Sequence, residues 1–299
     1  MKNLTSDILK EFTAFLFDAD GVLCLGDQPI PGASDFLKLL CDEGKEIFVV
    51  SNNSTKTVDS YAKKFHNLGF SMITTKNLIT PAKVTASILS KTGSELPVYL
   101  IGSKGLQQEL ANFGVESFGV GSDPAENYTE TDFITKVDVQ QPVQAVVVSY
   151  DVHISYVKIM KAINYIHQPG VKFIATNEDA TYPGPYKDVI VPGAGTNVVA
   201  VKVSAGKDPM VVGKPCRPMF DYVCNSFGIN AKDMLMFGDR LDTDIKFGRD
   251  NGFETVLVGT GVHGLSDVKE YKEKNRFDLV PEYYVPSLKD CCDLCQRRP

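Results

Sequence analysis

The sequence predicts an α/β fold, in which a doubly wound parallel sheet built from both ends of the chain carries an inserted α/β domain. Short apolar runs rich in β-branched and aromatic residues alternate with helical patterns along almost the whole chain. That alternation is typical of strands joined by crossover helices. The runs are also continuous, and strands of this kind are buried on both faces, as in a parallel sheet flanked by helices.

The expected strands follow one another from residue 13 to residue 258. In chain order they are TAFLF (13–17), EIFVV (46–50), PVYLI (97–101), QAVVV (144–148), KFIAT (172–176), PMVV (209–212), DMLMF (233–237) and ETVLV (254–258). A helix is expected from Val58, because apolar residues recur at helical spacing as far as Leu68 and Gly69 then supplies a stop signal.

The residues that follow these strands divide the chain into two domains. In a parallel sheet, ligands bind beyond the carboxyl ends of the strands. Four ends carry distinctive polar groups, in DADG, SNNS, GKP and GDRLDTD, whereas the runs between 97 and 176 end in GSKG, SYD and TNED. We therefore expect a catalytic core built from residues 1–81 and 209–299, with residues 82–208 inserted as a second domain.

Composition and charge exclude several classes of protein. A formal net charge of -6, with Lys and Arg spread along the chain, offers no basic surface for nucleic acid or an anionic membrane. Asp7 and Glu11 interrupt the start where a signal peptide needs an apolar stretch, and no later run is long enough to span a membrane. We expect a cytoplasmic protein.

The seven cysteines are expected to be reduced thiols, because their number is odd and several lie within globular patterns. Cys291, Cys292 and Cys295 lack a second Cys or His pair that would complete a tetrahedral zinc site. The role of these three residues stays open.

Acidic residues gather at two strand ends. Asp18 and Asp20 share one side of the backbone alternation, just where the first strand stops, and Gly21 permits a sharp exit. Two carboxylates in one small space favour a hard cation such as Mg²⁺. Asp239 and Asp244, from GDRLDTD, could complete its oxygen shell, while the neighbouring Asp242 is less central.

Polar and basic groups at two further strand ends suit a phosphate. Ser51 offers a hydroxyl, Asn52 and Asn53 offer amide donors, and Lys214 brings a point positive charge. With the carboxylates, they supply a nucleophile, an acid/base, a metal site and an anion-binding group, which is the set expected for phosphoryl transfer.

DADGV, SNNS, GKP and GDRLDTD, in that order, resemble the four motifs of haloacid dehalogenase superfamily phosphatases, and the resemblance spans nearly the whole chain. Within that superfamily, the chain resembles more specifically the branch that contains nagD-type proteins, phosphoglycolate phosphatase, pyridoxal phosphate phosphatase and p-nitrophenylphosphatase. That branch has a Rossmann-like core with a cap domain inserted between the second and third motifs. The resemblance implies that residues 82–208 are the cap.

The resemblance also implies roles for the site residues. Asp18 would attack phosphorus, and Asp20 would protonate the leaving alcohol and then activate water. Mg²⁺ would be held by Asp18, the carbonyl of Asp20 and Asp239, with Asp244 acting through water. The remaining residues would bind the transferring phosphoryl group: Ser51, Asn52, Asn53 and Lys214.

The cap is expected to select the substrate. Thr181, Tyr182 and the Gly/Pro-rich loop after them are the residues expected to reach it. A histidine occupies about the Tyr182 position in the pyridoxal phosphate relatives, and this departure argues against pyridoxal phosphate as the substrate. Phosphoglycolate or another small phosphorylated metabolite is the expected substrate class. p-Nitrophenyl phosphate should serve as a laboratory substrate. Caps of this type often pair, so a homodimer through the cap is expected.

Other readings of the sequence remain open at this point. Asp18 could be the phosphorylated residue of a non-enzymatic switch, or the chain could be a phosphomutase or another phosphomonoester phosphatase. Gly259, Gly261 and Gly264 fit the GxGxxG dinucleotide pattern after a strand. No further strand with an acidic end follows them, so we expect only a Gly-rich turn.

Overall fold

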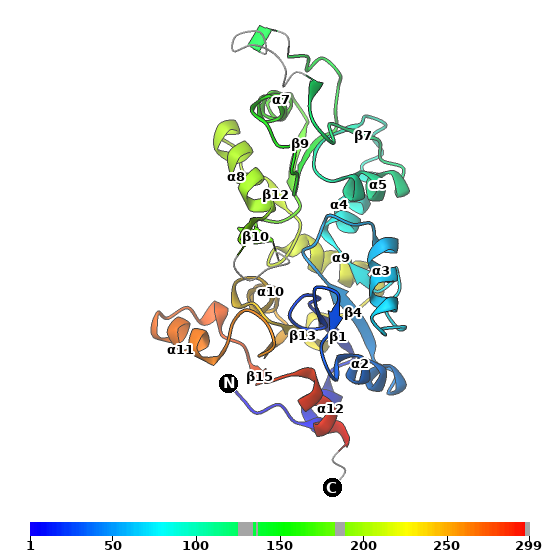
Figure 1. The fold of residues 1–299 in the computed structure, drawn as a ribbon, viewed down its shortest axis with the longest axis vertical. Helices are drawn as coiled ribbons and strands as arrows, with labels where there is room; N and C mark the ends of the chain where they lie inside the picture. Colours follow the sequence, from blue (N-terminus) through cyan, green and yellow to red (C-terminus); the bar gives the residue numbers. More distant parts are fainter. Residues whose placement is uncertain (125–133, 136, 183–188, 297–299) are drawn as a thin grey trace. The chain divides into compact units, whose positions relative to one another are not determined.

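The computed structural model describes residues 1–124, 134–135, 137–182 and 189–296, and its contacts group the chain into two compact units (Figure 1). Unit 1 comprises Met1–Ser51, Val58–Ile79 and Lys214–Pro299. Unit 2 comprises Asn52–Thr57 and Thr80–Gly213. Each unit therefore contains segments that are distant in the sequence, and the short segment 52–57 belongs with the second.

Unit 1 is built on a parallel sheet in the order β15-β14-β13-β1-β4-β5. Its strands are β1 (Ala14–Phe17), β4 (Glu46–Val50), β5 (Leu78–Ile79), β13 (Met234–Gly238), β14 (Glu254–Val258) and β15 (Tyr283–Val285). From β1 the chain adds strands outward on one side, through β4 and β5, and later on the other side, through β13, β14 and β15. The predicted doubly wound fold is confirmed, and its switch point falls at β1 and β13.

Both faces of this sheet are covered, which explains why its strands are apolar throughout. On one face Phe17 and Phe237 stack with ring centroids 5.0 Å apart, and Phe36 of α2 (Ala33–Asp42) packs edge-on against both. On the other face Phe48 of β4 meets Phe227 of α9 (Arg217–Phe227) at 4.6 Å. Each fully buried ring of this size contributes about 1.5–3 kcal/mol through the hydrophobic effect.

The remaining elements of unit 1 are short helices and one hairpin. They are α1 (Ser6–Glu11), β2 (Cys24–Leu25), β3 (Gln28–Pro29), α3 (Val58–Asn67), η2 (Ala231–Asp233), η3 (Leu241–Ile245), α10 (Lys246–Asn251), α11 (Leu265–Glu273), η4 (Phe277–Leu279) and α12 (Leu288–Gln296). The expected helix from Val58 is α3, and Gly69 follows it with φ +90°, a conformation that glycine adopts without strain.

Unit 2 repeats the architecture with a smaller parallel sheet in the order β12-β9-β8-β6-β7. Its elements are α4 (Pro81–Ser90), β6 (Val98–Ile101), α5 (Lys104–Asn112), β7 (Ser117–Phe118), β8 (Ala145–Val148), α7 (Tyr156–Ile166), β9 (Lys172–Ala175), β10 (Thr181–Tyr182), β11 (Val191–Pro192), α8 (Ala194–Ala205) and β12 (Met210–Val211). Thr80, Ser103 and Ser155 cap α4, α5 and α7, each accepting a hydrogen bond from a backbone N–H three residues on.

The strand that precedes GKP lies in unit 2, although the expected boundary assigned it to the core. Met210 and Val211 of β12 pair with Ile174 and Ala175 of β9. The ladder therefore holds this strand in the second sheet, and the contact grouping changes between Gly213 and Lys214 instead of at residue 208.

No helix within the described ranges is both long enough and apolar enough to cross a membrane. The seven cysteines, all of which fall in those ranges, are free thiols.

Candidate active site

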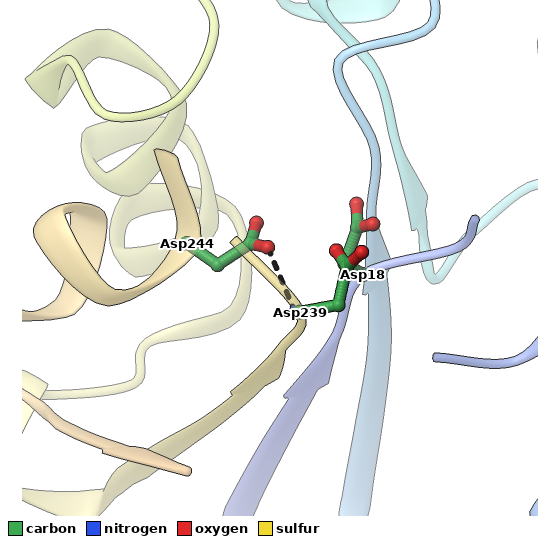
Figure 2. Close-up of side chains that lie close together, drawn as sticks. All are labelled: Asp18, Asp239 and Asp244. Atoms are coloured by element: carbon green, nitrogen blue, oxygen red, sulfur yellow. Dashed lines mark hydrogen bonds between the residues drawn. The ribbon is translucent and has the colours of Figure 1, made fainter. Parts of the chain in front are cut away.

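Three carboxylates meet at the switch point of unit 1 (Figure 2). Asp18 follows β1 and Asp239 follows β13, and these neighbouring strands pair in register up to Phe17 and Phe237. Asp244 comes from η3, a single π-helical turn. One oxygen from each carboxylate lies within 4.8 Å of the other two. The topology thus brings together acids that are more than two hundred positions apart in the sequence.

Lys214 lies against two of these acids. Its Nζ donates to Asp18 Oδ1 at 2.5 Å, to Asp244 Oδ1 at 2.7 Å and to the Val50 carbonyl at 2.6 Å, and the side chain is only 2% exposed. Burial alone lowers the pKa of Lys214, but the Asp18 and Asp244 carboxylates outweigh that effect and raise it. The lysine is therefore charged, and one ammonium faces three carboxylates.

Burial and the excess of negative charge raise the pKa values of two of the acids. Burial raises the pKa of Asp18 well above its ordinary value, against the opposing effect of Lys214, and Asp244 and Asp239 add to the rise. Burial and the neighbouring Asp244 likewise raise the pKa of Asp239 to about 7. A second positive charge would return both groups to the ionised form.

The oxygens of Asp239 and Asp244 are engaged differently. Asp239 Oδ2 accepts from the Val262 N–H at 2.8 Å, whereas Asp239 Oδ1 is buried without a hydrogen-bond partner. Both oxygens of Asp244 are taken, Oδ1 by Lys214 and Oδ2 by the N–H groups of Asp239 and Arg240 at 3.2 and 3.1 Å. An orphaned carboxylate oxygen among like charges is a group that could bind a hard divalent cation, together with the Asp18 carboxylate beside it.

The two other acids of these motifs lie outside the three-carboxylate cluster. Asp20 is partly exposed and forms an isolated backbone bridge with Cys24, made possible by Gly21 at φ +90°. Asp242 is paired with the Arg240 guanidinium at 3.1 and 2.8 Å. Burial raises the pKa of Asp242, but that hydrogen-bonded pairing outweighs it and lowers the pKa.

The SNNS residues divide between the units. Ser51 ends in unit 1, buried, with its Oγ 3.3 Å from Tyr61 Oη. Asn52 belongs to unit 2, where its Nδ2 donates to both Asp179 oxygens at 3.1 and 3.2 Å, and its carbonyl accepts from Asn177 Nδ2 at 2.9 Å. The segment after β4 is therefore held by the loop that follows β9.

Tyr182 contacts the second asparagine of this segment. Asn53 Nδ2 donates to Tyr182 Oη at 3.1 Å, and the Tyr182 ring lies 5.2 Å from that of Tyr150. Thr181 is exposed at the start of β10. Residues 183–188 of the predicted Gly/Pro-rich loop lie outside the described residues. Within unit 2, Asn52 is thus bound by Asp179 and Asn53 by Tyr182.

The residues that hold the acids in place were not among those expected from the sequence. Gly261, Val262 and His263 contact Asp239 or the start of η3, yet their motif read as a simple turn. A signal was present, because this Gly-rich stretch also follows a strand at the carboxyl edge of the core sheet.

Two protein-family models match the chain: haloacid dehalogenase-like hydrolase over residues 15–116 and HAD-hydrolase-like over residues 211–291. Human glycerol-3-phosphate phosphatase is 38% identical over 95% of this chain and 91% of its own length. The 4-nitrophenylphosphatase of Schizosaccharomyces pombe is 35% identical over 94% of both chains. A NipSnap protein of Caenorhabditis elegans is 47% identical over 83% of this chain, which spans only 48% of that protein.

Solved structures of similar proteins share the fold. p-Nitrophenyl phosphatase from Archaeoglobus fulgidus has a TM-score of 0.79 and 28% identity, covering 94% of this chain and 98% of its own. Glycerol phosphate phosphatase from Mycobacterium tuberculosis, solved in complex with magnesium, has a TM-score of 0.77 and 25% identity, covering 99% of this chain and 79% of its own.

Proposed function

Since this chain belongs to the haloacid dehalogenase-like hydrolase family as one of its phosphatases, we propose that it hydrolyses small phosphomonoesters through a phospho-aspartate formed on Asp18. The observation that carries the proposal is the position of the Asp18 carboxylate, gathered with Asp239 and Asp244 and paired with Lys214. A buried carboxylate beside a fixed ammonium and a cation site suits attack on a negatively charged phosphoryl group.

Covalent catalysis would divide the hydrolysis into two displacements. In the first, an Asp18 oxygen bonds to phosphorus while the bond to the leaving oxygen breaks, and Asp20 gives that oxygen a proton. In the second, Asp20 takes a proton from water, whose oxygen bonds to phosphorus and releases phosphate and Asp18. The partial exposure of Asp20, two residues beyond Asp18, supports its exchange of protons with substrate and water.

Mg²⁺ is the proposed cofactor, held by Asp18, the Asp20 carbonyl and Asp239, with Asp244 acting through water. The orphaned Asp239 Oδ1 supports a direct contact, and the fully engaged Asp244 supports an indirect one. When bound, the ion supplies positive charge that offsets the carboxylates and polarises phosphoryl oxygens. The relative solved with magnesium has the same overall fold.

Phosphate binding is assigned to Ser51, Asn52, Asn53 and Lys214. Lys214 is the best supported of these, because its Nζ already bonds the nucleophile. Unit 2, close in extent to the expected insertion 82–208, is the proposed cap. The tie between Asn53 and Tyr182 supports a cap that shares its residues with the phosphate-binding segment.

The proposed substrates are small phosphomonoesters such as phosphoglycolate and glycerol 3-phosphate, with p-nitrophenyl phosphate as a laboratory substrate. Names of the relatives support this class, since they include glycerol-3-phosphate phosphatase and 4-nitrophenylphosphatase. Pyridoxal phosphate stays as the alternative, disfavoured by Tyr182. We also propose a homodimer through the cap, and a cytoplasmic location that the free cysteines support.

Phosphate release from a panel of these compounds, with and without Mg²⁺, tests the proposal. Wild type should turn over repeatedly only with Mg²⁺, and Asp18→Asn should lose turnover. Asp7→Asn is the matched control, since Asp7 is 85% exposed and paired only at the surface with Lys10. A single stoichiometric burst would instead support a phospho-acceptor switch, and transfer of the phosphoryl group to an added sugar without release of free phosphate would support a mutase.

A further inference from the structure

The Gly-rich stretch after β14 lies next to the cation site within unit 1. β14 is the neighbour of β13 in the sheet, so the loops that leave these two strands share one edge. The segment concerned is residues 259–263, called here the 259–263 loop. Gly264 lies beyond it as the N-cap of α11, where its N–H donates to Asp267 Oδ2 at 2.7 Å.

The 259–263 loop donates hydrogen bonds to Asp239 from two successive backbone amides. The Val262 N–H donates to Asp239 Oδ2 at 2.8 Å, and the His263 N–H donates to the Asp239 carbonyl at 3.0 Å. The side chain and the backbone of the acid are therefore both fixed. Because Oδ2 is occupied in this way, the buried Oδ1 is the oxygen left to face the cation site.

Two glycines enclose the same carboxylate. A Cβ at Gly261 would lie 2.0 Å from Asp239 Oδ2, and one at Gly21 would lie 2.4 Å from it. Thr260 Oγ1 donates to the Gly21 carbonyl at 2.6 Å, which ties the loop after β14 to the loop that carries Asp18 and Asp20. Any side chain at Gly261 must therefore displace the Asp239 carboxylate or the loop itself.

His263 connects the loop to the third acid. Its Nδ1 accepts from the Leu241 N–H at 3.1 Å, which satisfies a backbone donor in the first turn of η3. That turn carries Asp244, whose position depends on how η3 begins. An acceptor at Nδ1 requires the proton of a neutral ring to be on Nε2.

We propose that the 259–263 loop is the positioning element of the cation site, an inference that rests on the proposed function for its catalytic meaning. It orients Asp239 with one oxygen free for the metal, and through His263 it fixes the start of η3 and hence Asp244. Groups that orient metal ligands without touching the metal typically change affinity by about 10–100-fold when removed.

The test measures Mg²⁺ affinity by calorimetry on protein freed of metal with a chelator. Gly261→Ala should raise the Kd for Mg²⁺ at least about tenfold, the low end of such effects. Gly264→Ala is the matched control: the nearest atom to its Cβ is Asp267 Oδ2 at 4.0 Å, and its φ of −129° suits alanine. That variant should bind Mg²⁺ as wild type does.

A second pair of variants covers the case in which Gly261→Ala does not fold. His263→Leu removes the acceptor for the Leu241 N–H and should also raise the Kd, whereas His263→Asn keeps an acceptor at a similar distance and should restore it. In turnover assays the Mg²⁺ concentration for half-maximal rate should follow the Kd, while the substrate KM at saturating Mg²⁺ should change little.

Variants that melt at lower temperature but bind Mg²⁺ with the wild-type Kd would show that the loop only stabilises the fold, and would overturn the proposal. A wild-type chain that binds no Mg²⁺ would overturn it as well. Because the Kd for Mg²⁺ is measured without substrate, it tests the role of the loop even if no phosphomonoester is cleaved. A failure of this proposal can therefore be distinguished from a failure of the proposed function.

Discussion

The two parallel sheets both end in polar residues at their carboxyl edges, but the charges of these residues are balanced in unit 2 and unbalanced in unit 1. In unit 2, Thr176 Oγ1 donates to Ser149 Oγ at 2.8 Å, and Ser54 Oγ lies 2.8 Å from the same hydroxyl. Asp151 and Lys158, at most 2% exposed, form a buried ion pair with one charge of each sign. The polar groups of this edge satisfy one another.

The edge of unit 1 is left unbalanced. Three carboxylates share one ammonium, and a buried Asp239 oxygen has no hydrogen-bond partner. Because both units share the α/β architecture, that architecture does not itself create a reactive site. The site lies where the sequence places charges that the protein alone cannot compensate, at some cost in stability. Changes at the two edges should therefore have opposite consequences.

The largest expected effect concerns the balanced edge. Lys158→Met leaves the Asp151 carboxylate buried without its ammonium, which should lower the free energy of unfolding by about 3–5 kcal/mol. Denaturant titration measures this loss. The folded fraction should retain the wild-type Mg²⁺ affinity. Lys172→Met, at an exposed position of the same unit, is the control and should change stability by less than about 0.5 kcal/mol.

At the unbalanced edge of unit 1, Asp239→Asn should lower activity but raise stability. Activity should fall by about 10²–10³-fold, because a charged group that acts in the transition state is lost. At pH 8, above the raised pKa of Asp239, the melting temperature in chelator should rise, because one of three like charges is removed and the new amide can donate to a neighbouring carboxylate. A melting temperature well below that of wild type would contradict the idea that this edge stores repulsion.

The affinity of the unit 1 site for Mg²⁺ should depend on pH, because burial and the crowded carboxylates there raise the pKa of Asp239. The pKa of Asp239 is raised from 3.8 to about 7, so below that pH the folded, metal-free protein holds a proton that Mg²⁺ must displace. Affinity should therefore rise about tenfold between roughly pH 6 and pH 8. The stability that this proton gives in chelator is lost as pH rises through about 7. Calorimetry at several pH values, repeated with Asp239→Asn, measures the effect; an affinity independent of pH would rule it out.

The smallest expected effect lies within unit 2, where Asn53 of the proposed phosphate-binding segment contacts Tyr182. Tyr182→Phe removes the hydroxyl that accepts from Asn53 Nδ2, a hydrogen bond worth about 0.5–1.5 kcal/mol. The KM for a small phosphomonoester should rise a few-fold while kcat stays close to wild type. Tyr156→Phe, at a 73% exposed position, is the control. A fall in kcat alone would contradict a role in substrate binding.

Patterns within single segments were enough to predict much of this molecule. The eight apolar runs all contain strands, since a strand buried on both faces must be apolar throughout. Asp18 and Asp239 could be paired in advance because parallel strands end at a common edge. The confirmed fold and family follow from these features.

Contacts between distant segments could not be predicted in the same way. Nothing in SNNS indicates that Asn52 is bound by Asp179, because that contact depends on where the loop after β9 returns. Similarly, PMVV resembles a core strand until its ladder with β9 is known. The role of Gly261 depends on a carboxylate carried by another strand, so the motif alone indicated only a turn.

The segment 52–57 has a consequence for modular engineering. Residues 80–213 look like a transplantable block, yet Ser54 completes the hydroxyl cluster of unit 2, and Thr55 accepts a hydrogen bond from Ser103 at the start of α5. A chimera that takes only residues 80–213 would leave the transplanted unit without its own Ser54 and Thr55, and the recipient's connector would have to make their contacts. An exchange of the proposed cap between such proteins should therefore move the connector and the block together, as two pieces of one module.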